Sequence, residues 1–201
     1  WFKRGNNVNG ALFSAPINGS TNGFSIFFDA DQLVLFEYKN TGQSSYFKLT
    51  SSAALRDTTN WYHLVAIFDT NSSGGGSSDT GASARVRMYL NGRLMDVSLT
   101  GSIGADYESL TWNNTYVHEI LNQRTSTFPF DGYIAEVNFI DGTAVGHTQV
   151  GDDYILDELG EMKNGVWIPA DPTSLTYGTN GFRLQFKQTG TGTASTSTIG
   201  A

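Results

Sequence analysis

The amino-acid sequence predicts an all-β fold, in which about ten short strands form a two-sheet antiparallel jelly-roll β-sandwich with one short helix. Charged residues make up only 15% of the 201-residue chain, aromatic residues make up 13%, and there are 23 glycines. This composition favours short strands joined by polar turns. Residues 62–68 alternate with apolar side chains on both faces, which is typical of a strand packed on both sides. Asn91-Gly92 then follows the strand-like residues 85–90 and is a strong signal of a β-hairpin.

The first half of the chain indicates a series of consecutive antiparallel strands. Residues 29–31 form the turn of an expected hairpin, and the Ser- and Gly-rich residues 71–83 form an expected surface loop. Residues 1–3 are interpreted as the end of a strand that begins outside this sequence. The remaining strands expected in this half are 11–15, 24–28, 32–38, 46–49, 62–68 and 85–90.

The second half contains fewer strand signals and the one helix candidate. Residues 151–163 place Tyr154, Leu156, Leu159 and Met162 about three apart, which favours a single helical turn. Residues 116–121, 132–140 and 181–187 are expected strands, and 165–169 is an expected extended plug. We therefore expect a jelly-roll domain over residues 1–188, truncated in its N-terminal strand, and a Gly/Ser/Thr-rich linker or arm over residues 189–201.

Composition also excludes several classes of function. The formal net charge is −7 and no cluster of Lys and Arg occurs, so we expect no nucleic-acid partner. No apolar run approaches the length of about 18 residues that a membrane span needs, so we expect no membrane insertion. The chain has no cysteine, which excludes disulfides, thiol catalysis and zinc–thiolate sites.

Three segments together resemble the laminin-G-like branch of the concanavalin A-like lectin/glucanase superfamily. They are residues 60–69 (NWYHLVAIFD), 86–93 (VRMYLNGR) and 130–141 (FDGYIAEVNFID). The longer sequence FDGYIAEVNFIDGTAV, followed by GVWIP and YGTNGF, is similar to modules in fibre and appendage proteins of marine bacteriophages. The resemblance implies a two-sheet jelly roll whose usual activity is binding to carbohydrate or protein. The residues that match the family pattern in order are Trp61, His63, Tyr89, Asn91, Gly92, Phe130, Gly132, Ile134 and Glu136.

Sugar binding needs aromatic rings in polar loops, because a ring can stack on a pyranose face while amide and carboxylate groups bond to hydroxyls. The best such cluster, our candidate glycan-binding site, consists of Tyr107, Trp112, Asn113, Asn114 and Tyr116. The alternative for Trp112 is that it covers the edge of a sheet.

Glu136 to Asp141 invites comparison with the glucanase signature E-x-D-x-x-E, in which two carboxylates flank the scissile bond. Here Asn138 replaces the central acid, and Asp141 is shorter than the glutamate that the signature requires. We therefore predict a protein that is not an enzyme and assign no catalytic residue. His63 lies in an apolar strand and is expected to be a half-buried histidine bonded across the sheet, the alternative being a metal or catalytic role.

Calcium binding is one interpretation of three oxygen-rich pairs in this sequence, because carboxylate and amide oxygens are the ligands that calcium prefers. Asp and Asn residues are also ordinary turn formers. We assign no cofactor and no metal ligand. The oxygen-rich pairs in question are Asp29 with Asp31, Asp69 with Asn71, and Asp152 with Asp153.

The sequence and the resemblance together predict a non-enzymatic structural or adhesion module at a virion surface or in another extracellular setting. The expected partners are other virion subunits, including copies of this chain in a homotrimer, and host-surface glycan. One alternative is a carbohydrate-binding module of a secreted polysaccharide-degrading enzyme. A second alternative is a glucanase.

Overall fold

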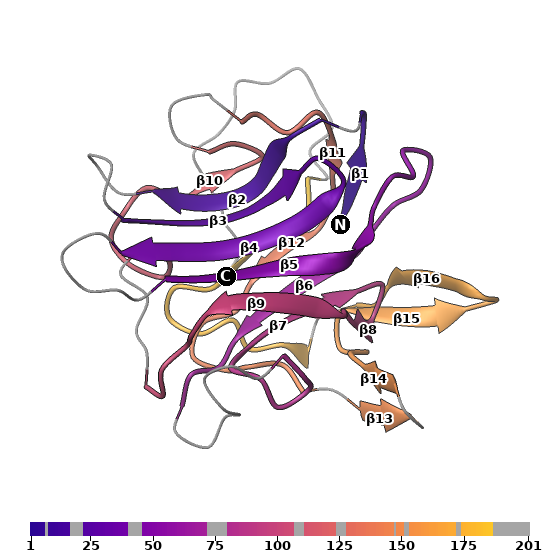
Figure 1. Ribbon diagram of the computed structural model, residues 1–201. Coiled ribbons are helices and arrows are strands. Elements are labelled where there is room, and N and C mark those ends of the chain that lie inside the picture. Colours follow the sequence, from indigo (N-terminus) through magenta and orange to yellow (C-terminus); the bar gives the residue numbers. More distant parts are fainter. Residues whose placement is uncertain are drawn as a thin grey trace, which may run out of the picture.

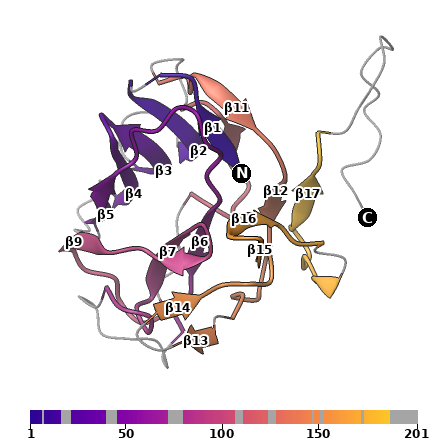
Figure 2. The ribbon, with the colours of Figure 1, turned by 90° about the vertical axis from the view of Figure 1, so that its right-hand side faces the viewer.

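The computed structural model describes residues 1–6, 8–16, 22–39, 46–71, 80–106, 111–123, 128–146, 148–150, 153–171 and 174–186. Two antiparallel sheets form the body of the molecule and lie face to face (Figures 1 and 2). The larger sheet has the order β10 (Glu119–Ile120), β2 (Gly10–Pro16), β3 (Asn22–Asp29), β4 (Gln32–Lys39), β5 (Tyr46–Ala54) and β9 (Val97–Gly101). The second has the order β13 (Thr148–Val150), β14 (Asp153–Ile155), β8 (Arg93–Leu94), β7 (Val86–Leu90) and β6 (Leu64–Phe68). The predicted two-sheet antiparallel sandwich is therefore confirmed.

The other described strands form three two-stranded ribbons; in Figure 2, β1 and β11 lie near β2, whereas the other two ribbons lie on the side of β6 and β7. All three are antiparallel, and two of them join segments that are far apart in the sequence. The ribbons are β1 (Phe2–Arg4) with β11 (Gly132–Ile134), β12 (Val137–Phe139) with β17 (Phe182–Leu184), and β15 (Gly160–Lys163) with β16 (Val166–Pro169).

The main hydrophobic core lies between the two sheets. Phe28 and Leu49 of the larger sheet and Met88 of β7 are almost completely buried in this core. A second, smaller core lies on the opposite face of β6 and β7, where Ile67 and Tyr89 contact residues from the C-terminal part of the chain. Because both faces of β6 and β7 are covered, these strands are apolar on both sides, as the sequence predicted.

Asn91 and Gly92 form the predicted hairpin turn between β7 and β8. Their φ angles are +50° and +79°, the two positive values that a type I′ turn requires. Gly92 is required for a second reason, because a Cβ atom at this position would lie 2.3 Å from the ring of Trp167. Trp167 belongs to the β15–β16 hairpin, and the close approach of its ring to Gly92 holds that hairpin against the β7–β8 turn.

The predicted helical turn at 151–163 is wrong for the residues that the structure describes, 153–163. They form β14 and the first strand of the β15–β16 hairpin instead. Leu156 and Leu159 are buried in the second core, so their spacing reflects two contacts with the sheet rather than one face of a helix. The amide of Leu156 donates to the carbonyl of Gly92, and Ile155 pairs with Arg93, which satisfies this backbone by sheet bonding.

Two other expectations need correction. The single strand expected over residues 132–140 is two strands, β11 and β12, separated by Glu136 with a φ of +50°. The apolar neighbours of Trp61 in the sequence favour a core position, yet it is 43% exposed, since it precedes the strand at the edge of the polar loop 56–60. The Gly/Ser/Thr-rich segment 189–201 lies outside the described residues.

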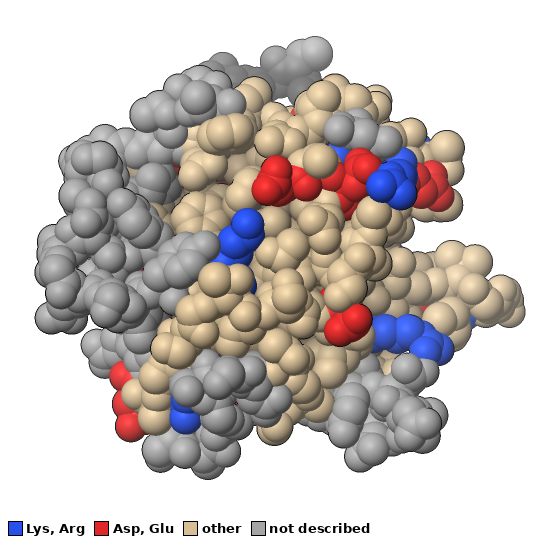
Figure 3. Space-filling model, in the orientation of Figure 1, with Lys and Arg blue, Asp and Glu red and all other residues tan. Residues whose placement is uncertain are grey.

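Charged side chains are sparse over the larger sheet. On the face seen in Figure 3, the described Lys and Arg side chains stand singly or beside acidic ones and do not gather into a basic patch. The described part of the chain contains no helix that is long and apolar enough to span a membrane.

Candidate functional site

The predicted glycan cluster lies in the loop between β9 and β10, of which residues 102–106 and 111–118 are described. Trp112 is half-buried, and its indole packs on the rings of Phe24 at 4.9 Å and of Phe68 and Phe139 at 5.5 Å each. It thus closes the end of the main core. The other described members, Asn113, Asn114 and Tyr116, are exposed, whereas Tyr107 lies outside the described residues.

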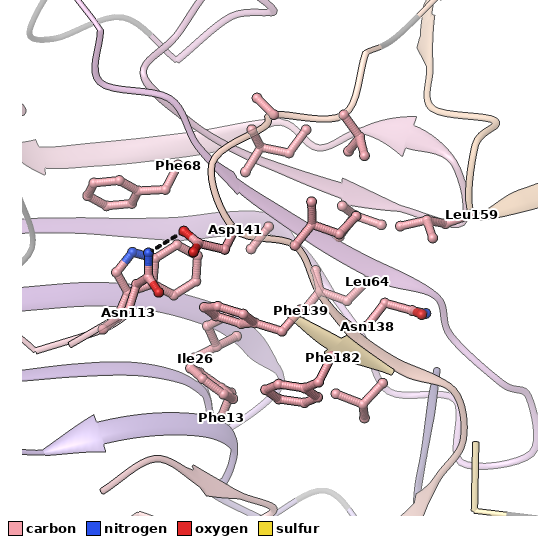
Figure 4. A pocket seen from close by; sticks show the side chains of 18 of the residues that line it. Phe13, Ile26, Leu64, Phe68, Asn113, Asn138, Phe139, Asp141, Leu159 and Phe182 are labelled. Atoms are coloured by element: carbon pink, nitrogen blue, oxygen red, sulfur yellow. Dashed lines mark hydrogen bonds between the residues drawn. The ribbon is translucent and has the colours of Figure 1, made fainter. Parts of the chain in front are cut away.

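Asn113 meets two polar side chains that the sequence did not group with it. Its side-chain amide donates to Asp141 Oδ1 at 2.7 Å, as Figure 4 shows. Asn180 donates from its backbone N to Asp141 Oδ2 at 3.2 Å and from Nδ2 to Asn113 Oδ1 at 3.4 Å. We call Asn113, Asp141 and Asn180 the polar rim. Three loops supply these residues, so the rim exists only in the folded chain.

Further contacts fix the rim in place. The backbone of Asn113 donates to His118 Nε2 at 3.1 Å, while His118 Nδ1 lies 2.8 Å from the carbonyl of Tyr116. Asp141 N donates to the carbonyl of Tyr177 at 2.8 Å. Gly178 has a φ of +80° and leaves no room for a side chain, because a Cβ atom there would lie 2.1 Å from the Asp141 carbonyl oxygen. The rim is therefore preformed.

A cleft of about 960 Å³ begins beside the rim and extends between β6 and β12. Its floor is mainly apolar, and the rings of Phe139 and Phe182 stack in it at 5.5 Å between centroids (Figure 4). The hydroxyl of Tyr177 donates to Asn138 Oδ1 at 2.8 Å on the cleft wall, and burial raises the pKa of Tyr177. The phenol therefore stays protonated and remains a donor at neutral pH.

Glu136, the first residue of the glucanase-like segment, is engaged by an arginine. Arg183 Nε donates to Glu136 Oε2 at 2.9 Å, and both side chains are largely buried. Asn138 accepts from Tyr177, and Asp141 belongs to the polar rim. Each polar residue of this segment therefore has a structural partner.

Two of the acidic residues considered for calcium, Asp31 and Asp69, contact arginines. Asp31 lies 2.7 Å from Arg56 and 3.5 Å from Arg4, and Asp69 lies 3.7 Å from Arg87. Asp152 is outside the described residues. Within the described ranges, no group of three or more His, Cys, Asp or Glu side chains is arranged to hold a metal ion.

His63 is a buried histidine with a hydrogen bond across the fold. Only 4% of it is exposed, its ring stacks on that of Trp1 at 4.5 Å, and its Nδ1 accepts from Trp167 Nε1 at 3.0 Å. Burial lowers the pKa of His63 from 6.5 to about 3. The imidazole is therefore neutral in the folded protein at physiological pH, and its acceptor nitrogen anchors the β15–β16 hairpin.

This burial predicts acid sensitivity. Between pH 6.5 and about 3 the unfolded chain protonates His63 whereas the folded chain does not, so stability falls as the pH falls through this window. At pH 5 we expect His63 to lower the free energy of unfolding by about 2 kcal/mol relative to pH 7. Denaturant titrations of the wild type and of His63→Gln, which keeps an acceptor for Trp167, should show a smaller pH dependence in the variant. Equal slopes would contradict the assignment.

The rim contains two residues that the sequence interpretation missed as binding candidates. Asp141 was considered only as a catalytic acid, and Asn180 was not considered. Both precede a glycine, which marks a turn, but no local pattern reveals that these turns meet Asn113. The contacts span 28, 39 and 67 residues of sequence.

Two antiparallel sheets packed face to face, with preformed polar loops at one end, define a β-sandwich domain, a fold that does not by itself fix a function. A laminin-G-type family model, described as the concanavalin A-like lectin/glucanases superfamily, matches residues 1–151, and the chain belongs to this family. Domains of this type typically act as non-catalytic binding modules. Comparisons with curated proteins and with solved structures returned no match.

Proposed function

We propose that this chain is a non-enzymatic adhesion module of a virion surface appendage, such as a phage fibre, and that it binds host-surface glycan at the polar rim. The observation that supports this proposal most strongly is the polar rim, which presents preformed amide and carboxylate groups at an end of the sandwich formed by loops. Sugar hydroxyls require such groups in fixed positions, because each hydroxyl both donates and accepts hydrogen bonds.

Tyr116 supplies the aromatic surface that this proposal needs. Tyr116 is 43% exposed, and its backbone is linked to Asn113 through His118. Trp112 has a structural role instead, because its indole packs on the core and thereby supports the loop. The binding surface therefore consists of the polar rim with Asn114 and Tyr116, and Trp112 positions it.

For the assignment to a virion surface, the supporting observation is the resemblance, inferred from the sequence, of FDGYIAEVNFIDGTAV followed by GVWIP and YGTNGF to phage fibre modules. The neighbouring domains of the parent polypeptide test it. Fibre repeats on the same polypeptide are expected. A catalytic polysaccharide-degrading domain there would instead identify the chain as a carbohydrate-binding module of an enzyme.

A glycan array tests the binding site. Wild-type protein is expected to retain at least one glycan class, and Asp141→Asn is expected to weaken binding about tenfold, since a hydrogen bond to a charged group is worth about 1.5–3 kcal/mol. Tyr116→Ala is expected to weaken it by a similar factor. Tyr133→Ala is the matched control, because Tyr133 is 64% exposed on β11 and belongs to neither the rim nor its loop.

Absence of binding to every glycan would overturn the glycan part of the proposal and favour a role in assembly alone. Equal losses in Tyr116→Ala and Tyr133→Ala would place binding outside the rim. Thermal melts of each variant accompany the array, so that loss of fold is distinguished from loss of contact.

A further inference from the structure

The cleft beside the polar rim has strand edges as its walls. β6 is the terminal strand of its sheet, and among the described strands it pairs only with β7. Just before β6, Tyr62 forms an isolated bridge with Phe2. β12 pairs with β17 on one side and with no described strand on the other. Residues of both β6 and β12 line the cleft. Two edges that present backbone donors and acceptors therefore face one apolar space.

At one end of the cleft, a strand already occupies the space between the two walls. Phe2 exchanges backbone hydrogen bonds with Tyr62 at 2.8 and 2.9 Å, while β1 pairs on its other side with β11. Trp1 continues this arrangement, since its carbonyl accepts from Ala135 N at 2.9 Å. The walls at this end are thus two strand spacings apart, about 10 Å, which is the width that one intervening strand fills.

The register of β1 predicts which groups face the cleft. Phe2 and Tyr62 form a hydrogen-bonded antiparallel pair, and such pairs recur at every second residue. The peptide groups of Leu64 and Ala66 therefore point into the cleft. His63, one residue out of phase, uses its carbonyl on the opposite side, where it accepts from Asn91 N at 2.8 Å.

The side chains that line the cleft define what fits there. Leu12 and Ile26 belong to the main core, whereas Val145 and Leu159 belong to the second core. A strand between them would direct alternate side chains into the two cores. The occupant must therefore be apolar on both faces, as β6 is.

We propose that the cleft is a strand slot, filled by an extended apolar segment of about five residues joined directly to the N-terminal side of β1. The residue before Trp1 would lie opposite Leu64, and the segment would run along β6 toward Phe68 and the polar rim. Covalent continuity with β1 selects this occupant over a free peptide, because β1 already holds the register and direction. With it, β17, β12, the slot segment, β6 and β7 form one continuous sheet. The slot is then an element of the fold, distinct from the rim.

The test adds a short segment to the chain. The sequence Thr-Val-Ile-Val-Thr is placed before Trp1, and Gly-Ser-Gly-Ser-Gly in the same position is the matched control. Amide hydrogen exchange at Leu64 and Ala66, read residue by residue by NMR, is expected to slow at least a hundredfold with the apolar extension relative to the control. The melting temperature is expected to rise only with the apolar extension.

Equal exchange at Leu64 and Ala66 in the two extended proteins would overturn the proposal. Slow exchange at both positions in the unextended chain, lost on dilution together with a dimer, would also overturn it, because a second copy would then supply the strand. An Ile→Pro change at the central position of the apolar extension should abolish the protection, since proline removes a ladder hydrogen bond. These readouts do not involve glycan, so they are independent of the proposed function.

Discussion

Replacing Arg4 by methionine is expected to lower the free energy of unfolding by about 3 kcal/mol. Arg4 is 1% exposed, and its guanidinium donates to the carbonyls of Leu55 at 2.6 Å and Ala30 at 3.0 Å. It also lies 4.1 Å from the ring centre of Phe28 and 3.5 Å from Asp31. Methionine fills similar space but leaves these buried carbonyls without a donor.

Arg56→Met is the matched control for this prediction. Arg56 pairs with the same Asp31 at 2.7 Å but is 71% exposed, so its loss is expected to cost less than about 1 kcal/mol. Chemical denaturation of both variants measures the difference. Similar costs for the two arginines would show that the ion pair, rather than the buried carbonyl contacts, provides the stability.

Trp112→Ala is expected to cost about 3 kcal/mol, because truncating a packed indole removes buried contacts and leaves a cavity. The ring contacts with Phe24, Phe68 and Phe139 join the loop to both sheets and to the β12–β17 ribbon. Trp112→Phe retains part of this packing and is expected to cost less than half as much. Urea titrations of the two variants check this order.

This stability effect changes how Trp112 can be used to test binding. Loss of glycan by an unstable Trp112→Ala protein would report unfolding, so Asp141→Asn and Tyr116→Ala are the better functional variants. If Trp112→Ala instead unfolds at the same urea concentration as the wild type and still loses glycan, the indole is part of the binding surface. That result would contradict the packing role assigned to it above.

Much of the fold could be predicted because its signals are local. Alternation over residues 62–68 and the Asn91-Gly92 turn depend on neighbours in the sequence, and both are found as expected. Asn164-Gly165 carries the same turn signal and closes the β15–β16 hairpin with φ angles of +51° and +78°. The sequence interpretation overlooked this second signal and placed a helical turn just before it, at residues 151–163.

The remaining features depend on contacts that no local pattern encodes. Arg4 has the composition of a surface residue, yet it is buried because carbonyls from two distant loops converge on it. His63 and Trp167 are 104 residues apart in the sequence. The polar rim likewise combines three loops, so sequence could identify Asn113 as a candidate but could not identify Asp141 and Asn180 as its partners.

The central claim is that ligand binds at the polar rim while the adjoining cleft serves the sheet. NMR chemical-shift mapping of the labelled chain, titrated with the strongest glycan from the array, tests it most directly. We expect the largest shifts at Asn113, Asp141, Asn180 and Tyr116, with little change at Ala66 and Val137 inside the slot. Shifts centred on Ala66 and Val137, with the rim unaffected, would contradict the claim and make the cleft itself the binding site.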